Sequence, residues 1–546
     1  MTRIVFAAGL VAASVLLAGP AAAFCGFYVA GAESDLYADA TMVVMMREGT
    51  TTVLSMQNDY RGPVENFAMV VPVPVVLAEE NVKTLDKEIF ARVDRLAAPR
   101  LVEYWEQDPC AVGADGFGTI GFARGGGMRS PSRPRRAAGR LQVQVEAEFA
   151  VGEYEIVILS AQDAGDLETW LRQNGYSIPD GAAAALAPYV QSGMKFFVAK
   201  VDVTKVTFDD GRALLSPLRV HYDSDEFSLP IRLGMLNSSG TQDLIVHVLA
   251  RNQRFEAASY ENVNIPTNLE VVDGVRESFG GFYAALFDKT IEEHEGAVVT
   301  EYAWQATGCD PCPGPVLSEQ DLLSLGADVV PGLRGPSTII PRVPLPRPRR
   351  GGRFNSSPFQ SFVLTRLHYR YGRGELGADL VLRPASPIQG GRGVGPAGEL
   401  PTEARESGAN NFQGRYIIRH PWEGEISCDE PHRGRWGGPP PDKQRDGASG
   451  TPRAATNLGT QARGGVQLVA LLKQPLPALG LTEVGPAPVP EPPAPVQQPA
   501  QEPAASVETV AVDGGCGCRA SPGRPPSLPL AAGLLVLWAA TRRNRR

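Results

Sequence analysis

The sequence contains few of the residue patterns that mark an enzyme active site. It has six histidines in 546 residues, and none of them belongs to an H-E-x-x-H pattern. It also lacks a G-x-S-x-G motif and a P-loop, so the usual anchors for a metalloprotease, an esterase or a nucleotide-hydrolysing enzyme are missing. His247 and His368 lie in apolar-alternating stretches, where a structural histidine is more common than a catalytic one. The sequence therefore predicts no catalytic residue, no metal ligand and no cofactor.

The sequence also has no excess of positive charge. Its formal net charge is −8. Seven arginines lie in residues 1–23 and 519–546, which contain no acidic residue, so residues 24–518 carry a net charge of −15. Nucleic acids and anionic lipid headgroups are bound by basic surfaces, so the acidic body argues against both as main partners.

Long apolar runs stand at the two ends of the sequence. Near the N-terminus, an apolar run at residues 4–18 leads to small residues that include Ala21 and Ala23. This pattern is typical of a secretory signal peptide, and we predict cleavage by signal peptidase after Ala23, with an uncleaved anchor as the alternative. Phe24 precedes Cys25, where a lipoprotein signal would have a small residue, so we do not expect lipid attachment at Cys25.

The second apolar run, residues 528–540, is followed by four arginines that would hold the C-terminus in the cytoplasm. Its 13 residues would cover about 20 Å as a helix, compared with about 30 Å for the hydrocarbon core of a bilayer. The run is short for a permanent transmembrane helix, although it can cross a thin bilayer, and it suits a tail that is removed during anchoring. A Pro-rich spacer precedes it, and before the spacer stand Gly515, Cys516, Gly517 and Cys518.

This C-terminal end resembles the MYXO-CTERM sorting domain of myxobacterial surface proteins. The resemblance rests on Cys-Gly-Cys-Arg at residues 516–519 and on the arginine-rich terminus. It implies processing near the cysteines by a sorting protease and display at the surface of a Gram-negative cell envelope. The expected partners are therefore the membrane, reached through the tail, together with the envelope signal peptidase and this protease.

The sequence between the ends divides by composition. The predicted parts are a signal peptide at 1–23, a body at 24–474, a Pro-rich stalk at 475–515 and a sorting tail at 516–546. The stalk favours an extended polyproline conformation. Three stretches of the body are rich in Gly, Pro and Arg and poor in apolar residues, and we predict flexible surface insertions at 111–140, 331–357 and 433–465.

The body alternates strand and helix signals, which predicts an α+β fold with largely antiparallel sheets, in one or two domains. Two hairpins are expected, at residues 41–56 and at residues 141–159 around Gly152. Apolar residues at helical spacing predict a helix within residues 83–105 that ends before Pro99, and further helices at 166–174, 182–191 and 279–292. Additional strands are expected at 67–76, 196–203, 218–222, 244–250 and 298–304.

The cysteines of an exported protein can form disulfides, but their connectivity cannot be derived from the sequence. Cys309 and Cys312 have the C-x-x-C spacing of redox centres. Pro313 and Pro315 exclude the helix that usually lowers the pKa of the first thiol, so we favour a local structural disulfide. Thiol-disulfide exchange and partial metal binding are the alternatives. The candidate disulfide cysteines of the body are Cys25, Cys110, Cys309, Cys312 and Cys428.

Two further patterns carry weak functional signals. Residues 393–398 match G-x-G-x-x-G, but Pro396 and a Gly-rich approach do not fit the strand and helix of a dinucleotide site. Carboxylates lie near the aromatic residues Tyr60, Tyr104 and Trp105, a mixture that a glycan-active cleft uses. These carboxylates are Asp59, Glu65, Glu79, Glu80, Glu103, Glu106 and Asp108.

Several segments of the body are distinctive in combination. They are Cys-Gly-Phe at 25–27, Met-Gln-Asn-Asp-Tyr at 56–60, and the segments 67–74, 101–106, 309–312, 364–371 and 415–422. Together they resemble the bacterial domain-of-unknown-function family 2330, over roughly residues 24–430. The resemblance implies an exported protein of unassigned activity.

We therefore expect a surface-displayed envelope protein with a structural or binding role. The alternatives are an exported hydrolase with a dispersed active site and a thiol-disulfide protein that uses Cys309 and Cys312. A deep pocket lined by converging carboxylates or histidines would favour the hydrolase.

Overall fold

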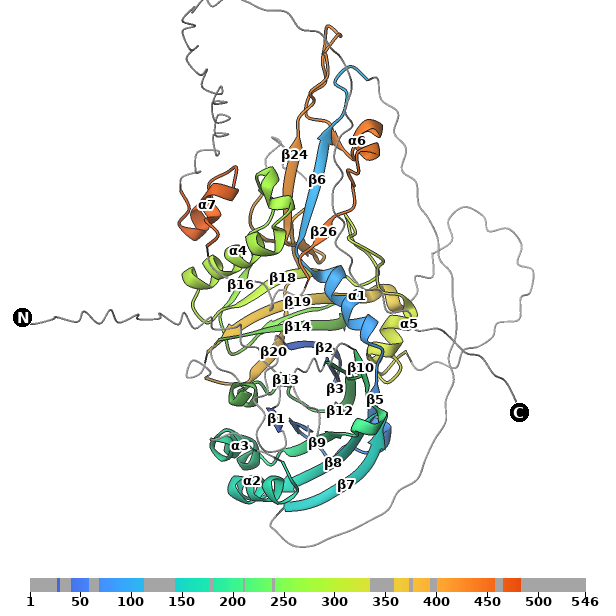
Figure 1. Ribbon diagram of the computed structural model, residues 1–546, viewed down its shortest axis with the longest axis vertical. Coiled ribbons are helices and arrows are strands. Elements are labelled where there is room, and N and C mark those ends of the chain that lie inside the picture. The colour runs from blue at the N-terminus through green and yellow to red at the C-terminus, as the bar shows by residue number, and fades with distance from the viewer. Residues whose placement is uncertain are drawn as a thin grey trace, which may run out of the picture. The chain divides into compact units, whose positions relative to one another are not determined.

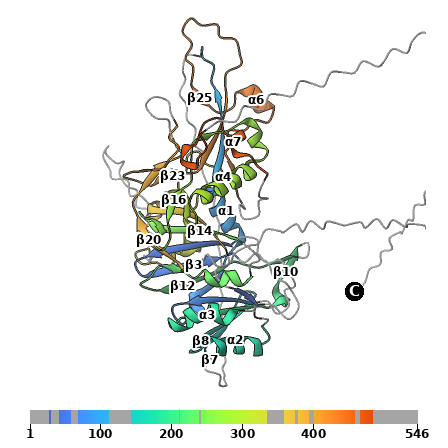
Figure 2. The same cartoon turned by 90° about the vertical axis from the view of Figure 1, so that its left-hand side faces the viewer.

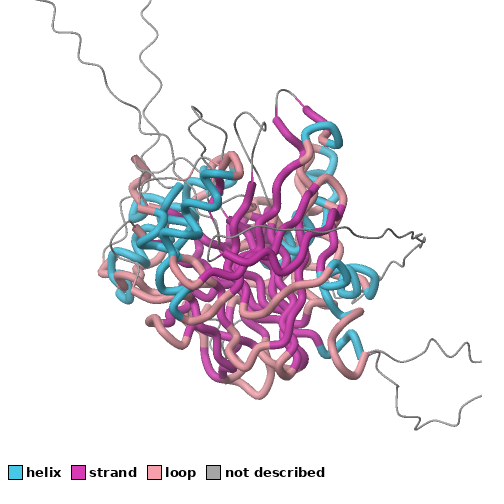
Figure 3. Tube along the Cα trace, turned by 90° about the horizontal axis from the view of Figure 1, so that it is seen from below, coloured by secondary structure: helices cyan, strands magenta, loops and turns pink. Residues whose placement is uncertain are grey.

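The computed structural model describes residues 27–29, 41–57, 68–111, 143–176, 178, 181–209, 212–237, 241–333, 358–372, 377–392, 400–456 and 465–482. Within these residues the protein is α+β with mostly antiparallel sheets, which confirms the predicted fold class. The strands lie together at the centre of the described part, and the helices lie around them (Figure 3).

An eleven-stranded sheet forms the centre of the fold (Figure 1). Its middle strands are buried on both faces along most of their length, as in β2 (Thr41–Glu48), β14 (Gln242–Arg251) and β19 (Phe362–Tyr371). β2 and β3 (Thr51–Met56) form the first predicted hairpin, and β14 lies between β2 and β19. The other strands are β5 (Val82–Thr84), β12 (Leu218–Asp223), β16 (Asn262–Asn264), β18 (Val298–Gln305), β21 (Ile388–Gly390), β22 (Arg405–Glu406) and β23 (Asn411–Gln413).

A five-stranded sheet packs against the central sheet through a shared apolar core that includes Ile156, Phe197 and Leu54. Its other face is covered by α2 (Ala164–Gln173) and α3 (Ala182–Gln191), which bury residues such as Leu167 and Leu186. β7 and β8 confirm the second predicted hairpin. The strands of this sheet are β1 (Phe27–Val29), β4 (Ala68–Val73), β9 (Lys195–Val201), β8 (Tyr154–Ala161) and β7 (Val143–Val151).

A third sheet is built around two parallel neighbours, β6 (Arg100–Glu106) and β24 (Arg415–His420). It also contains β17 (Leu269–Glu270), β25 (Trp436–Gly437) and β26 (Arg453–Ala454). Helix α4 (Phe279–Glu293) packs on this sheet, with Phe282 against Tyr416, and α7 (Leu468–Leu471) belongs to the same core. β6 and β24 run side by side toward the end of the molecule that carries β25 and α6 (Pro441–Arg445) (Figures 1 and 2).

Helix α1 (Lys87–Ala97) begins where the Asp86 carboxylate accepts a hydrogen bond from the Glu88 amide. It ends before Pro99, as predicted, and the chain then continues directly into β6. α1 buries Phe90 and Val93 in a core with α5 (Glu319–Leu322) and η5 (Leu323–Ala327).

The remaining described elements are short. They are η1 (Glu79–Asn81), η2 (Val203–Lys205), β10 (Thr207–Asp209), β11 (Arg212–Leu214), β13 (Ser228–Leu229), η3 (Arg232–Asn237), β15 (Arg254–Ala257), η4 (Asp273–Arg276), η6 (Pro358–Ser361), β20 (Leu380–Ala385) and η8 (Pro477–Leu479).

Residues 433–456 of the insertion predicted at 433–465 contain two short strands. This stretch has few apolar side chains, as noted, but β25 and β26 both pair with the backbone of β6. Strand hydrogen bonds and polar contacts fix it instead of an apolar core. Residues 457–464, and most of the other two predicted insertions, lie outside the described residues.

Residues 475–482, where the predicted stalk begins, belong to the described part of the chain. Leu476 and Leu479 are 1% and 2% exposed and belong to the core beneath α4, so the body extends at least to residue 482. The remainder of the predicted stalk lies outside the described residues. None of the helices in the described ranges has the length and apolar character of a membrane span. The apolar runs at 4–18 and 528–540 are outside those ranges.

Candidate functional site

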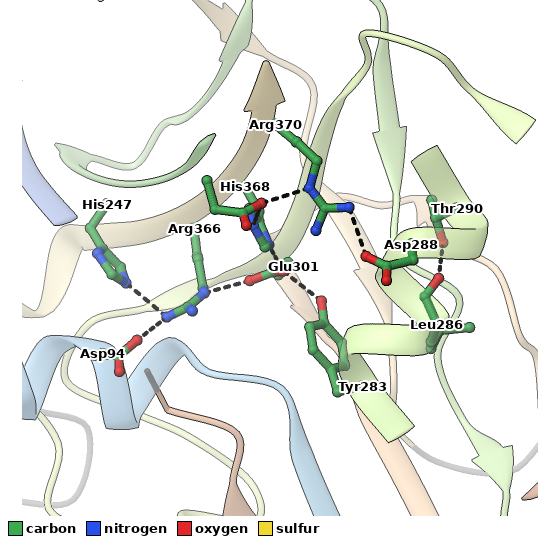
Figure 4. A network of polar contacts seen from close by, with 11 residues as sticks. Asp94, His247, Tyr283, Leu286, Asp288, Thr290, Glu301, Arg366, His368 and Arg370 are labelled. Atoms are coloured by element: carbon green, nitrogen blue, oxygen red, sulfur yellow. Dashed lines mark hydrogen bonds and ion pairs between the residues drawn. The ribbon is translucent and has the colours of Figure 1, made fainter. Parts of the chain in front are cut away.

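Two groups of polar side chains are candidates for a functional site. The first is a network in the central sheet (Figure 4). Arg366, His368 and Arg370 alternate along β19 and therefore leave the strand on the same face. Arg366 binds Asp94 of α1 and Glu301 of β18, and Arg370 binds Asp243 of β14 and Asp288 of α4.

His368 lies between two carboxylates in this network. Its Nδ1 is 2.8 Å from Glu301 Oε1, and its Nε2 is 3.0 Å from Asp243 Oδ1. An ionised carboxylate only accepts hydrogen bonds, so both ring nitrogens donate and the imidazole is protonated. Burial opposes this charge, but Glu301 and Asp243 outweigh it and raise the pKa of His368.

Glu301 is fully buried, yet it is ionised. Burial disfavours its charge, but Arg366 and His368 outweigh that effect and lower the pKa of Glu301 to about 2. The Tyr283 hydroxyl also donates to it. His247 is the neutral member of the group, because burial and the adjacent Arg366 lower the pKa of His247 well below its ordinary value.

The centre of this network cannot reach a ligand. The side chains of Arg366, Glu301 and His368 are between 0% and 2% exposed. The network connects α1, α4, β14, β18 and β19, and we assign it a structural role. His247 and His368 therefore have the structural role that their apolar surroundings predicted.

The second candidate is a surface cleft of about 1160 Å³ at the end of β6 and β24, which we call the β6 cleft. One side comes from residues 103–111 of β6 and its extension. The other side comes from the segment 420–453, which follows β24 and returns to pair with β6.

Glu103, at the base of the cleft, is bound by two partners. Arg276 donates from Nε and Nη2 at 2.9 and 2.8 Å, and His420 Nε2 lies 2.9 Å from Glu103 Oε2. Burial favours the neutral acid, but the hydrogen bonds from Arg276 and His420 outweigh it, so that the pKa of Glu103 is lowered. The His420 ring stacks on Trp105 with centroids 4.6 Å apart.

Glu106 holds the outer segment of the cleft in place. Its carboxylate accepts two hydrogen bonds from Arg433, both 2.8 Å, one from the Trp422 amide at 3.0 Å and one from the Gly434 amide at 2.7 Å. The hydrogen bond from Arg433 is the largest of the effects that lower the pKa of Glu106 to about 2. Glu106 is only 4% exposed, and its hydrogen bonds all go to the outer segment. Its charge therefore fixes that segment and does not face solvent.

A disulfide closes the same region covalently. Cys110 and Cys428 are bonded, with their Cα atoms 5.5 Å apart. The backbone amide of Gln107 donates to the carbonyl of Arg435 at 2.7 Å, and the backbone amide of His432 donates to the carbonyl of Pro109 at 2.9 Å. The segment that forms the outer wall is therefore tied to the extension of β6 at several points.

The predicted C-x-x-C disulfide is confirmed, because Cys309 and Cys312 are bonded to each other. The sequence left the pairing of Cys110 and Cys428 open. Cys25, the processing residues Gly515, Cys516, Gly517 and Cys518, and the cleavage residues Ala21 and Ala23 lie outside the described residues, as does the G-x-G-x-x-G string at 393–398.

The structure gathers part of the predicted carboxylate set. Glu103, Glu106 and Asp108 line the β6 cleft together with Trp105. Glu79 and Glu80 lie in η1 and do not line the cleft, while Asp59, Tyr60 and Glu65 are outside the described residues. In the described part of the chain, no group of three or more His, Cys, Asp or Glu residues is arranged to hold a metal ion.

Sequence reasoning did not single out Arg276, His420, Trp422 or Arg433 as site residues. Arg276 lies in η4, far along the chain from Glu103. His420 and Trp422 lie within the distinctive segment at 415–422. That segment was the one feature of the sequence that could have pointed to them as site residues.

The family model described as an uncharacterized protein conserved in bacteria (DUF2330) matches residues 19–382, about two thirds of the sequence. The chain belongs to this family. No curated protein and no solved structure matches it. The family match ends before residues 415–422, so the extent of roughly 24–430 inferred from the sequence was too long. β6 and Arg276 lie within the match, whereas the outer wall of the β6 cleft follows it.

Proposed function

We propose that this protein is exported to the surface of a Gram-negative cell envelope and acts there by binding a ligand in the β6 cleft. Export is supported by the signal-peptide pattern that ends at Ala23. Surface display is supported by the resemblance of residues 516–546 to the MYXO-CTERM tail of myxobacterial proteins.

The ionisation state of the carboxylates in the cleft is the observation that supports a binding role. A glycosidase needs a carboxylic acid whose pKa is raised so that it can donate a proton. Here Arg276 and His420 lower the pKa of Glu103, and Arg433 lowers that of Glu106 to about 2. These groups are ionised, hydrogen-bonded and used to build the cleft, which favours recognition over proton transfer.

Arrays of envelope polysaccharides and of peptides test the binding role. The mature protein is expected to bind at least one probe, and Trp422→Ala is expected to weaken that binding. A matched control is Trp304→Phe, because Trp304 lies in the core with α1 and α5 and does not line the cleft. Failure to find any ligand that depends on Trp422 would contradict the proposal.

A hydrolase is the second candidate, because a carboxylate-oriented histidine faces a large cleft. Glu103 fixes His420 by a 2.9 Å contact, which is the geometry of a general base and its orienting acid. The test is conversion of a bound ligand by the native protein but not by His420→Gln.

Mass spectrometry of protein released from intact cells tests export and processing. We expect an N-terminus at Phe24 and no peptide beyond Cys518. An intact peptide that reaches Arg546 in surface-displayed protein would contradict removal of the tail. Normal display of a Cys516→Ser, Cys518→Ser double variant would remove the role of the two thiols.

A further inference from the structure

His420 presents a free hydrogen-bond acceptor in the β6 cleft. Glu103 is ionised and can only accept, and His420 Nε2 lies 2.9 Å from it, closer than the 3.4 Å that separates Nε2 from Arg276 Nη2. Nε2 therefore donates to Glu103 and carries the ring proton. With Nε2 as the donor, Nδ1 is the ring nitrogen left to accept a hydrogen bond. Nδ1 makes no hydrogen bond to any described residue, and the side chain is 21% exposed. One ring face lies on Trp105, so Nδ1 is the polar atom that a ligand can reach.

Several charges of the cleft are paired within the protein. Glu103 is paired with Arg276, and Glu106 is paired with Arg433. Arg435 donates to the Ala111 carbonyl, Arg453 donates to the Arg276 carbonyl, and Lys443 lies 3.8 Å from Glu423. Asp108, Asp442 and Asp446 also line the cleft and form no ion pair with a described residue, so charges of both signs remain and are interspersed. Because the cations are not gathered into a cluster, the cleft does not have the chemistry of a phosphate site. A neutral polar ligand fits it better.

The cleft also has a flat apolar surface. Trp422 and the consecutive prolines at 439–441 both line it. Gly424 packs closely on the indole, because a Cβ at that position would lie 2.6 Å from a ring carbon. Trp422 is therefore held in place, and its ring provides the kind of aromatic wall on which the C–H face of a sugar ring packs.

The size of the cleft indicates an oligomeric ligand. Its volume of about 1160 Å³ exceeds the range of about 300–1,000 Å³ that is usual for sites of single small molecules. We infer that the β6 cleft binds a neutral oligosaccharide, with a sugar hydroxyl donating to Nδ1 of His420 and a sugar ring packing on Trp422. This inference rests on the proposed binding role and names its ligand class.

Titration with neutral oligosaccharides tests the inference. The probes are β1,4-linked oligomers of glucose and of N-acetylglucosamine of increasing length, added to the mature protein and followed by calorimetry and tryptophan emission. We expect affinity to rise with length and to fall at least about tenfold in Trp422→Ala. Gly424→Ala should weaken binding as well, because it displaces the indole.

Two substitutions at residue 420 separate recognition from structure. In His420→Gln, the amide nitrogen can still donate to Glu103 but the acceptor at Nδ1 is lost, so affinity should fall about two- to tenfold. His420→Asn places an oxygen near the position of Nδ1 and gives up the contact with Glu103, so it should retain more affinity. Unchanged circular dichroism and melting temperature show that each variant is folded.

Native affinity in both Trp422→Ala and His420→Gln would overturn the inference. So would the absence of oligosaccharide binding. If a peptide instead bound in a manner that depends on Trp422, the ligand class would be wrong and the proposed binding role would stand. If neither kind of probe bound, both would fail.

Discussion

Glu301 has no contact with water, but three neighbours donate hydrogen bonds to its carboxylate. Arg366 and His368 supply positive charge, and Tyr283 supplies a hydroxyl.

Breaking a buried ion pair by neutralising one partner leaves the other charge unpaired and typically costs about 3–5 kcal/mol. We expect Glu301→Gln to lower the free energy of unfolding by about that amount in chemical denaturation. The matched control is Glu292→Gln, because Glu292 is 69% exposed and pairs only at the surface of α4, so its loss should cost less than about 0.5 kcal/mol. Equal effects of the two substitutions would contradict the network's structural role.

His368 makes a pH-dependent contribution to stability. Its pKa is raised in the folded protein, so the folded state binds the proton more tightly than the unfolded state. This contribution is complete below the unfolded pKa of about 6.5 and is lost as the pH rises through the folded pKa. His247 acts in the opposite direction, because its pKa is lowered, so the whole protein's pH profile mixes the two.

The difference between the native protein and His368→Gln isolates the contribution of His368. We expect the difference in unfolding free energy to be largest near pH 5–6, below the ordinary histidine pKa of about 6.5, and to shrink at alkaline pH. The groups that face His368 are Glu301, Asp243 and the ring of Phe287, and all three are retained in the variant. A difference that is constant or grows with pH would show that His368 is not protonated in the folded state.

The outer wall of the β6 cleft shows how an element with little apolar surface is held. Between residues 421 and 451, Pro439 alone is buried. Glu106 instead accepts four hydrogen bonds from the Arg433 side chain and the amides of Trp422 and Gly434. A hydrogen bond to a charged group contributes about 1.5–3 kcal/mol, so a single carboxylate can decide whether this segment stays closed.

Neutralising Glu106 should therefore expose the segment to protease. We expect trypsin to cut Glu106→Gln after Arg433 and Arg435 about tenfold faster than the native protein, because 1.4 kcal/mol changes the open population by a factor of about ten. Glu423→Gln is the control within the same segment, since Glu423 is 84% exposed. Native cleavage rates in both variants would mean that Glu106 does not hold the wall.

The two disulfides differ in the length of chain that they close. Cys110 and Cys428 are 318 residues apart, while Cys309 and Cys312 are 3 apart. Loop-closure entropy then assigns about 6 kcal/mol to the first and about 2 kcal/mol to the second. Denaturant unfolding of Cys110→Ser, Cys428→Ser and of Cys309→Ser, Cys312→Ser tests this order. The opposite order would show that the long loop retains structure when unfolded or that the short disulfide has another role.

At the scale of the whole molecule, the sequence predicted local structure well and distant pairing poorly. The hairpin of β2 and β3 and the helices α3 and α4 follow from patterns that repeat within a few residues. The pairing of β6 with β24 joins Arg100 to Arg415, and no local signal specifies that partner. Glu103 and Trp105 were recognised as residues that a glycan-active cleft could use, but the guanidinium and imidazole that complete the cleft come from other parts of the chain.

The predicted insertion and the predicted stalk both contain packed residues, for a related reason. Composition predicted a flexible insertion at 433–465 and a stalk from residue 475. Residues 433–456 are fixed by backbone pairing with β6, and Leu476 is buried under α4. Low apolar content and many prolines therefore did not exclude ordered structure where a strand edge or an apolar surface was available.

The fate of a bound ligand tests the central claim, that the β6 cleft recognises its ligand without converting it. The mature protein is incubated with a bound oligosaccharide, binding is measured at equilibrium, and the ligand is then recovered and weighed by mass spectrometry. We expect saturable binding that depends on Trp422, and a ligand that is recovered unchanged. A shortened or modified ligand produced by the native protein, and not by His420→Gln, would contradict the claim and would identify the β6 cleft as an active site.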